Sequence, residues 1–285
     1  MSNESLANLM TEKRRFAPPA EVAANANVTS EAYAAAAADR LGFWAEQARR
    51  LAWEKEPTET LDWSNPPFAK WFADGRLNVA YNCVDRHVEA GHGDRVAIHF
   101  EGEPGDSRSL TYAELQREVS QAAHALTELG VNAGDRVAIY MPMIPETVIA
   151  MLACARIGAP HSVVFGAFSA DALATRIEDA DARVVITADG GYRRGQPHAL
   201  KPSVDEALTR PGASGVRSVL VVRRTGQPIP WSEGRDVWWH EALERQPEVH
   251  TPQAFDAEHP LFILYTSGTT GKPKGILHTS GGYLT

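Results

Sequence analysis

Short runs of strand-forming residues alternate with helical segments from residue 95 onward, and this alternation limits the chain to few folds. Alternating strands and helices produce a mainly parallel β-sheet with helices packed on its faces. No fixed-period repeat or long linker divides this section, so it reads as one α/β body. Six strands are predicted, at Arg95–Phe100, Arg136–Met141, His161–Phe165, Arg183–Thr187, Arg217–Val222 and Leu261–Tyr265.

Capping signals predict three helices between these strands. Thr111 and Glu114 have the spacing of a capping box, the apolar residues that follow repeat at helical spacing, and Gly130 ends the segment. Pro145 suits the first turn of a second helix, which extends to residue 157. Ser169 can cap a third helix that extends towards residue 180. The alternation of strand and helix therefore continues through several units.

The first 90 residues differ in character from the rest of the chain. They are rich in alanine and tryptophan, contain proline breaks, and show short helical stretches without an alternating strand pattern. The run Ala34–Ala38 favours a helix, because alanine has the highest helix propensity. We predict two parts: residues 1–90 as a partly helical N-terminal extension that wraps the main body, and residues 91–285 as that α/β body.

Charge and cysteine content exclude several classes of protein. The formal net charge is −8, so no global positive field attracts nucleic acid or an anionic membrane. Cys83 and Cys154 are far apart in sequence, which leaves neither a disulfide framework nor a cysteine-based zinc site. The first residues show no signal-peptide pattern, and the longest apolar span, 148–155, is too short to cross a bilayer. These features predict a cytoplasmic protein that binds neither nucleic acid nor a membrane.

The segment Tyr265–Gly275, with sequence YTSGTTGKPKG, carries the strongest functional signal. Four hydroxyl side chains interleave with three glycines, so the backbone can turn N–H groups toward an anion while the side chains also donate. Lys272 and Lys274 add positive charge, and they are two of only six lysines in the chain. This concentration of donors and charge indicates a phosphate-binding loop.

Other readings of this loop and of the remaining motifs are weaker. A Walker A loop requires a glycine at position 266 and a serine or threonine at 273, where Thr266 and Pro273 stand. The segment could also be a flexible Gly/Ser/Thr surface loop, but the apolar strand before it and the proline between its two lysines argue against that interpretation. The sequence contains no GxGxxG fingerprint and no GxSxG elbow, and no acidic or cysteine partner completes a metal site with His87 and His92.

A second candidate loop, Gly190–Gln196 with sequence GGYRRGQ, follows the predicted strand that ends at Thr187. In α/β sheets ligands bind outside the carboxyl ends of strands, and adjacent arginines can grip a phosphate. A solvated basic loop fits the same residues. From their chemistry alone, both a phosphate site and a solvated loop stay open.

The loop Tyr265–Gly275 resembles the phosphate-binding signature of the adenylate-forming superfamily, which includes acyl-CoA synthetases, luciferases and the adenylation domains of peptide synthetases. The segment that follows it, ILHTSGGYL, is similar to the acetyl-coenzyme A synthetase family in particular. These matches occur in order and extend from the N-terminal extension to residue 285, so the chain is identified as a member of that family. The earlier segments that share the similarity are Asn78–His87, Val137–Glu146, Ala150–Gly158, His161–Gly166 and Glu233–His240.

The resemblance implies a ligase that uses ATP, Mg²⁺ and coenzyme A (CoA). Acetate attacks the α-phosphate of Mg·ATP to give acetyl-AMP and pyrophosphate, and the CoA thiol then takes the acetyl group. The loop would hold the β- and γ-phosphates and offset charge on the departing pyrophosphate, and Lys274 is the lysine most expected to contact phosphate. The residues assigned to ATP phosphate binding are Thr266, Ser267, Gly268, Thr269, Thr270, Gly271, Lys272, Lys274 and Gly275.

The resemblance also implies where CoA binds. In the family, the arginine loop contacts the phosphorylated nucleotide end of CoA, and three residues after a strand lie against its adenine. The family commonly has a second arginine at the position of Gln196 and a second glycine at that of Ala167, so weaker or rearranged contact is expected, with Arg194 compensating. The assigned CoA-binding residues are Arg193, Arg194, Gly195, Gln196, Phe165, Gly166 and Ala167.

Family members are longer than this chain, so we expect an N-terminal fragment that ends just after the phosphate loop. The acyl pocket and a C-terminal domain with the catalytic lysine would belong to the remainder, so no catalytic residue and no metal ligand is assigned here. The chain alone is expected to be inactive. Two alternatives stay open: a ligase for propionate or another short-chain acid, and a non-catalytic fragment that binds nucleotide or CoA.

Overall fold

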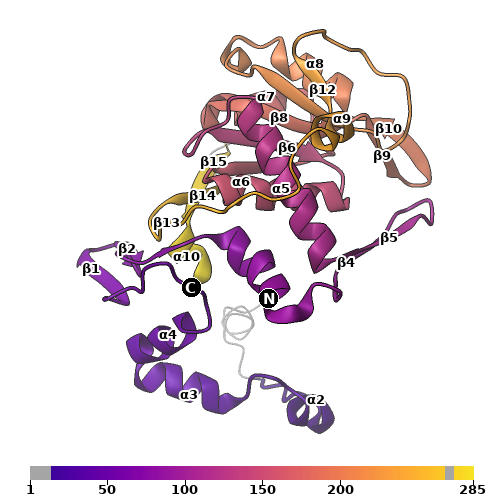
Figure 1. The fold of residues 1–285 in the computed structure, drawn as a ribbon. Coiled ribbons are helices and arrows are strands. Elements are labelled where there is room, and N and C mark those ends of the chain that lie inside the picture. The colour runs from indigo at the N-terminus through magenta and orange to yellow at the C-terminus, as the bar shows by residue number, and fades with distance from the viewer. Residues whose placement is uncertain (1–13, 267–272) are drawn as a thin grey trace, which may run out of the picture. The chain divides into compact units, whose positions relative to one another are not determined.

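The computed structural model describes residues 14–266 and 273–285 of the chain (Figure 1). The chain divides into two compact units, Met1–Gln47 and Ala48–Thr285. The described part of the first unit contains helices α2 (Ala20–Ala24) and α3 (Ser30–Ala38), and α4 (Arg40–Ala48) extends to the boundary. The alanine run thus lies within α3, as its helix propensity predicts.

A seven-stranded sheet forms the centre of the second unit, with the strand order β12-β11-β8-β6-β7-β14-β15. All neighbouring strands are parallel except β14 and β15, which are antiparallel. The predicted mainly parallel sheet is confirmed, and five of the six predicted strands lie in it. In sheet order, the strands are β12 (Asp236–Trp238), β11 (Ser218–Val222), β8 (Ala182–Ala188), β6 (Arg136–Met141), β7 (His161–Phe165), β14 (Pro260–Thr266) and β15 (Lys274–Thr279).

The sixth predicted strand, Arg95–Phe100, does not join this sheet, so its predicted place was wrong. Strand β4 (Val96–Glu101) pairs antiparallel with β5 (Ser107–Thr111) in a separate two-stranded sheet. The turn between them includes Gly105 at φ 90°, a conformation that favours glycine. This turn folds the chain back on itself, so β4 finds its partner in the next segment and not in the parallel sheet.

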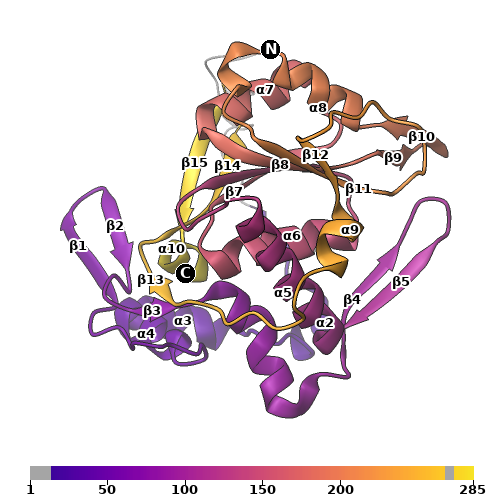
Figure 2. The same cartoon turned by 45° about the horizontal axis from the view of Figure 1, so that its top comes forward.

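Helices cover both faces of the sheet (Figure 2). Helices α5 (Tyr112–Glu128), α6 (Pro145–Ile157) and α9 (Trp239–Glu244) lie on one face, and α7 (Ala170–Ala180) and α8 (Lys201–Leu208) lie on the other. The chain passes from β6 to β7 through α6, and from β7 to β8 through α7. Because β8 and β7 lie on opposite sides of β6, the strand order reverses there. The sheet therefore has a topological switch point beside β6.

The predicted helix signals are confirmed. The hydroxyl of Thr111 accepts the N–H of Glu114 at 3.2 Å, and the Glu114 carboxylate accepts the N–H of Thr111 at 2.8 Å, which completes the capping box before α5. Helix α6 ends at Gly158, which has φ 71°. The hydroxyl of Ser169 accepts the N–H of Ala172 at 3.3 Å and caps α7.

Residues 48–95 contain short strands that the sequence did not predict. Strands β1 (Leu61–Asn65) and β2 (Phe68–Trp71) form an antiparallel hairpin, and β3 (Arg76–Leu77) pairs with β13 (Phe255–Asp256). The hairpin is mostly exposed, so its residues lack the alternation of a half-buried strand. The remaining short helices are η1 (Tyr81–Asp85), η2 (Val88–His92), η3 (Pro211–Ala213) and α10 (Ser280–Leu284).

Candidate functional site

A cavity of about 340 Å³ opens at the carboxyl ends of β6 and β7. Its walls are residues 141–144, which begin with the last residue of β6, residues 165–167, which begin with the last residue of β7, and residues 100–103 at the end of β4. Leu200, Arg224 and part of the hairpin formed by β9 (Gly190–Arg193) and β10 (Gln196–Ala199) complete them. The cavity thus lies at the topological switch point, where α/β sheets bind ligands.

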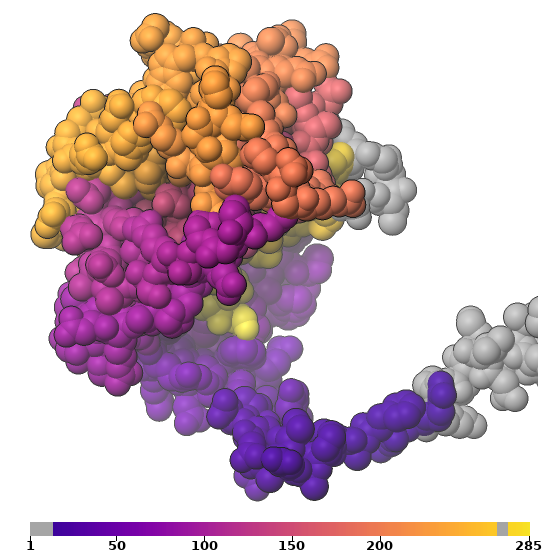
Figure 3. Space-filling view, turned by 90° about the vertical axis from the view of Figure 1, so that its right-hand side faces the viewer, coloured from indigo at the N-terminus to yellow at the C-terminus, as the bar shows by residue number. Residues whose placement is uncertain are grey.

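Two hairpins border this cavity. The β4–β5 and β9–β10 hairpins project from the same side of the α/β body in Figures 1 and 2. The N–H of Gly195 at the tip of β9–β10 donates to the carboxylate of Glu103, which belongs to the turn of the other hairpin. Figure 3 shows this side of the molecule, where the orange surface of later segments lies against the magenta surface of earlier ones. The cavity therefore has one wall from each hairpin.

The seven residues assigned to CoA binding lie in and around this cavity. Phe165, Gly166, Ala167 and Arg193 line it, although β7 and β9 are distant in sequence. Arg194, Gly195 and Gln196 are not among the lining residues. They follow Arg193 in the turn and first residue of β10, and Gln196 pairs directly with Arg193. The structure thus brings four of the seven to one surface and places the other three next to it.

Glycines allow the close approach of the backbone around the cavity. A Cβ atom on Gly190 would lie 2.6 Å from the carbonyl oxygen of His198, and one on Gly166 would lie 3.0 Å from that of Met141. Real Cβ atoms do not approach backbone atoms to the first of these distances. Gly190 is therefore required by the packing of the two hairpin strands.

Three arginines contribute positive charge, and they differ in how that charge is balanced. The guanidinium of Arg224, which lines the cavity, lies 2.5 and 2.9 Å from the two carboxylate oxygens of Asp106. This hydrogen bonding raises the pKa of Arg224 and lowers that of Asp106. Within residues 14–266 and 273–285, Arg193 and Arg194 form no ion pair with a carboxylate. Their exposed charge is therefore available to an anionic ligand.

Several lining residues were not assigned to CoA binding from the sequence, and Tyr192, His198 and Arg224 are among them. Tyr192 and His198 lie on the hairpin, and Arg224 follows β11. The guanidinium of Arg224 packs over the Tyr192 ring, 5.0 Å from its centroid. The position of Arg224 directly after a predicted strand was a signal that could have found it, because carboxyl ends of parallel strands share one edge.

The phosphate-loop assignment falls largely outside the described residues, which exclude Ser267, Gly268, Thr269, Thr270, Gly271 and Lys272. The flanking assigned residues are described. Thr266 ends β14, Lys274 begins β15, and the two are paired in register, as are Tyr265 and Gly275. Thr266 and Lys274 are exposed. Because β14 is parallel to β7, they lie at the same edge of the sheet as the cavity.

The end of β14 is anchored to α7 by an arginine and a carboxylate. Arg176 is buried, with its guanidinium carbon 5.3 Å from the Tyr265 ring and 4.7 Å from the Phe168 ring. The Tyr265 hydroxyl donates to Asp179 at 2.7 Å. Burial and this hydrogen bond raise the pKa of Tyr265. Tyr265, which precedes Thr266, is therefore held in contact with α7.

Residues 14–266 and 273–285 bring together no group of three or more histidine, cysteine, aspartate or glutamate side chains that could hold a metal ion. In the same ranges, no helix combines the length and apolar character needed to span a bilayer.

Comparison with known proteins places these features in a family. A family model described as acetyl-coenzyme A synthetase N-terminus matches residues 29–83, and one described as AMP-binding enzyme matches residues 84–285. A protein named acetyl-coenzyme A synthetase from Streptomyces avermitilis is 80% identical over 285 residues, which are 100% of this chain and 43% of that protein.

Two further proteins of that name agree. The one from Streptomyces coelicolor is 81% identical over 100% of this chain and 44% of its own length, and the one from Deinococcus radiodurans is 52% identical over 99% and 44%. The chain thus spans less than half the length of these relatives. Because the AMP-binding enzyme model matches well over half of the chain, the chain belongs to the AMP-binding enzyme family.

Proposed function

We propose that the complete protein encoded with this chain is an acetate–CoA ligase. In the first step, an acetate oxygen attacks the α-phosphate of Mg·ATP, the bond to the β-phosphate breaks, and acetyl-AMP and pyrophosphate form. In the second step, the CoA thiol attacks the acetyl carbonyl, loses its proton, and releases AMP. Mg²⁺ enters with ATP as part of the substrate.

One observation carries this proposal: proteins named acetyl-coenzyme A synthetase match the chain over its whole length at 80 and 81% identity. The position of the cavity is consistent with it. An aromatic ring, a glycine and an arginine with no carboxylate partner among the described residues meet at the carboxyl edge of the sheet, which suits a ligand that has both a planar base and phosphates.

The phosphate loop would bind ATP in the first step. We assign this role to Thr266, Lys274, Gly275 and the residues between Thr266 and Pro273. Exposed Thr266 and Lys274 lie side by side at the base of the loop, so a hydroxyl and an ammonium group can face the same phosphate. Fixed donors at the position where negative charge develops lower the barrier to pyrophosphate departure.

The cavity would bind CoA in the second step. Phe165, with Gly166 and Ala167, offers a flat apolar surface for adenine, and Arg193 offers a guanidinium for a phosphate. Arg194 follows in the hairpin turn and adds a second positive charge. Gln196 contributes no charge, so CoA binding depends on these two arginines and on Arg224.

We further propose that residues 1–90 form an extension of the α/β body, that residues 91–285 belong to the AMP-binding domain, and that the protein acts in the cytoplasm on small molecules. Cell fractionation tests the cytoplasmic location, and finding the protein in another compartment would contradict it. Limited proteolysis is expected to cleave first within the extension.

Acetate-dependent exchange between ATP and pyrophosphate, measured without CoA, tests the ligase assignment. The complete protein is expected to catalyse exchange that requires both acetate and Mg²⁺, and the 285-residue chain alone is not. Lys274→Ala is expected to lower the exchange rate by about tenfold or more, because removing one donor to transition-state charge typically costs several kcal/mol.

Lys70→Ala is the matched control, because Lys70 is an exposed lysine on β2 in a separate two-stranded sheet. It is expected to leave exchange unchanged. Propionate is assayed beside acetate. No acetate-dependent exchange by a folded complete protein would refute the acetate assignment, and faster exchange with propionate would replace it with the other acid.

A further inference from the structure

Asp189, the residue between β8 and β9, is fully buried, and among the described residues its carboxylate forms no ion pair. Its carboxylate accepts four backbone N–H groups. Oδ1 accepts from Gly190 at 2.7 Å, Arg224 at 2.8 Å and Thr225 at 2.9 Å, and Oδ2 accepts from Gly226 at 2.7 Å. A buried carboxylate held by backbone donors alone is stable only while those donors keep their positions.

The main chain of Asp189 makes two more bonds to the same surroundings. Its N–H donates to the carbonyl of Val222 at 2.9 Å, and its carbonyl accepts the N–H of Leu200 at 3.1 Å. Asp189 therefore fastens the start of β9, the end of the β9–β10 hairpin, and the loop after β11 to one point.

Both segments held in this way carry cavity walls. The hairpin carries Tyr192 and Arg193, and the loop after β11 carries Arg224, whereas Asp189 itself does not line the cavity. The relative position of Arg193 and Arg224 therefore depends on a carboxylate that lies behind both.

We infer that Asp189 is a positioning residue for the CoA site. It holds the β9–β10 hairpin, here called the arginine hairpin because it carries Arg193 and Arg194, and the loop 223–226 in the arrangement that binds the phosphates of CoA. The inference rests on the proposed function. It concerns the second half-reaction only, because the acetate and ATP step is assigned to the phosphate loop on β14 and β15.

The change Asp189→Asn tests this role. An amide places an NH₂ group against backbone donors, so at least one of the four N–H bonds is lost and the two segments shift apart. In the complete protein, the KM for CoA is expected to rise by about tenfold, which corresponds to about 1.4 kcal/mol. Acetate-dependent ATP–pyrophosphate exchange without CoA is expected to change by less than about twofold. A purely structural role would lower both activities together.

A second variant and a control keep the test decisive. Asp189→Glu keeps the charge but moves the carboxylate by one methylene, and it is expected to raise the KM for CoA as well; it decides the question if Asp189→Asn does not fold. Asp85→Asn alters another buried carboxylate, one that does not line the cavity, and is expected to leave the KM for CoA unchanged.

The possible failures are distinguishable. Absence of CoA-dependent acetyl transfer by the wild-type protein would refute the proposed function and this inference with it. Normal transfer by the wild type, with an unchanged KM for CoA in the folded Asp189 variants, would refute this inference alone.

Discussion

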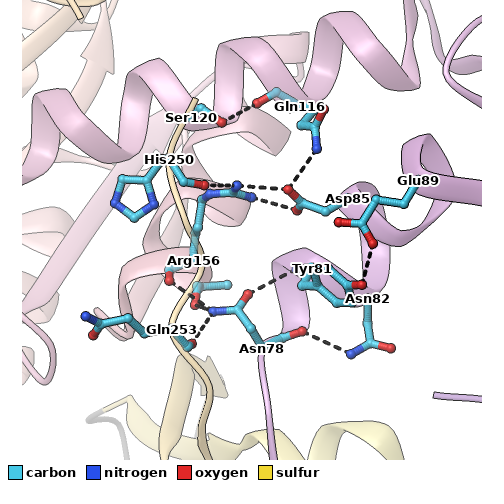
Figure 4. Close-up of polar contacts among 11 residues, drawn as sticks. Asn78, Tyr81, Asn82, Asp85, Glu89, Gln116, Ser120, Arg156, His250 and Gln253 are labelled. Atoms are coloured by element: carbon cyan, nitrogen blue, oxygen red, sulfur yellow. Dashed lines mark hydrogen bonds and ion pairs between the residues drawn. The ribbon is translucent and has the colours of Figure 1, made fainter. Parts of the chain in front are cut away.

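The guanidinium of Arg156 on α6 forms two hydrogen bonds with the carboxylate of Asp85 on η1, at 2.7 and 2.9 Å (Figure 4). The two side chains are only 2% and 5% exposed. Arg156 also donates to the carbonyl of His250, and the Gln116 amide donates to Asp85 at 2.9 Å. One buried ion pair thus joins η1, α5, α6 and the segment that leads to β13.

Removing one partner of this pair is expected to be costly. Arg156→Met leaves a buried carboxylate without its cation, so the free energy of unfolding of the 285-residue chain should fall by about 3–5 kcal/mol. Urea denaturation followed by far-UV circular dichroism measures it. Arg210→Met, which breaks the exposed pair with Asp171, is the control and should cost less than about 1 kcal/mol. A loss below about 1 kcal/mol for Arg156→Met would contradict this expectation.

His161 on β7 makes stability depend on pH. Burial lowers its pKa to about 4, against about 6.5 in an unfolded chain. Between these values the unfolded state binds a proton that the folded state does not, so stability rises with pH. The free energy of unfolding should be highest above pH 6.5 and fall as the pH drops towards 4, by about 3 kcal/mol from His161.

Denaturant midpoints at several pH values check this sign. His161→Phe removes the titrating group and should flatten the part of the curve between pH 6.5 and 4. The pKa of His250 is also lowered, to about 4, mainly by burial, so some dependence is expected to remain. If the free energy of unfolding changes with pH equally in the wild type and in His161→Phe, His161 does not contribute to the pH dependence of stability.

Arg193 is expected to recognise a phosphate group of CoA. Arg193→Ala should raise the KM for CoA by about tenfold, because a hydrogen bond to a charged group contributes about 1.5–3 kcal/mol. With dephospho-CoA, which lacks the 3′-phosphate, the same change should have less than about a twofold effect. Arg217→Ala is the control, since Arg217 is exposed, precedes β11 at the opposite edge of the sheet and does not line the cavity. An equal rise in KM with CoA and with dephospho-CoA would show that Arg193 does not contact the 3′-phosphate.

Gly190 should not tolerate a side chain. Gly190→Ala places a Cβ atom 2.6 Å from the backbone oxygen of His198, so the hairpin strands must separate, at a cost of about 1–3 kcal/mol. Thermal unfolding compares it with Gly93→Ala, where the nearest atom to a Cβ is a side-chain carbon at 3.5 Å. An unchanged melting temperature for Gly190→Ala would mean that the hairpin relaxes freely.

Much of the fold could be predicted because its signals are local. The Thr111–Glu114 capping box and Gly158 fix helix ends through contacts within a few residues. The apolar runs of β8 and β11 mark strands that are buried on both faces. Strand partners are not local: nothing within β4 distinguishes pairing with β5 from entry into the parallel sheet, since either choice satisfies its backbone groups.

The candidate site could be predicted only in part for the same reason. Phe165 was assigned only through the family resemblance. The position of Arg193 after a strand made it a candidate, because the carboxyl ends of parallel strands reach one edge of the sheet, but a solvated loop fitted it equally well. Arg224 also follows a predicted strand and was therefore a possible candidate, but its place at this cavity depends on the order of β11, β8 and β6, which local sequence does not determine. Asp189 looks like an ordinary turn residue beside two glycines, and only its burial and its four N–H partners distinguish it.

The turn of the arginine hairpin has a consequence for laboratory evolution. Arg194 and Gly195 both have positive φ, 55° and 74°, and a side chain at the first position costs about 1 kcal/mol relative to glycine. A library randomised at position 194 and selected only for thermal stability should therefore yield glycine or asparagine. The same library selected for growth on acetate should keep a basic residue, and the difference between the two pools would measure what the ligand requires beyond what the backbone prefers.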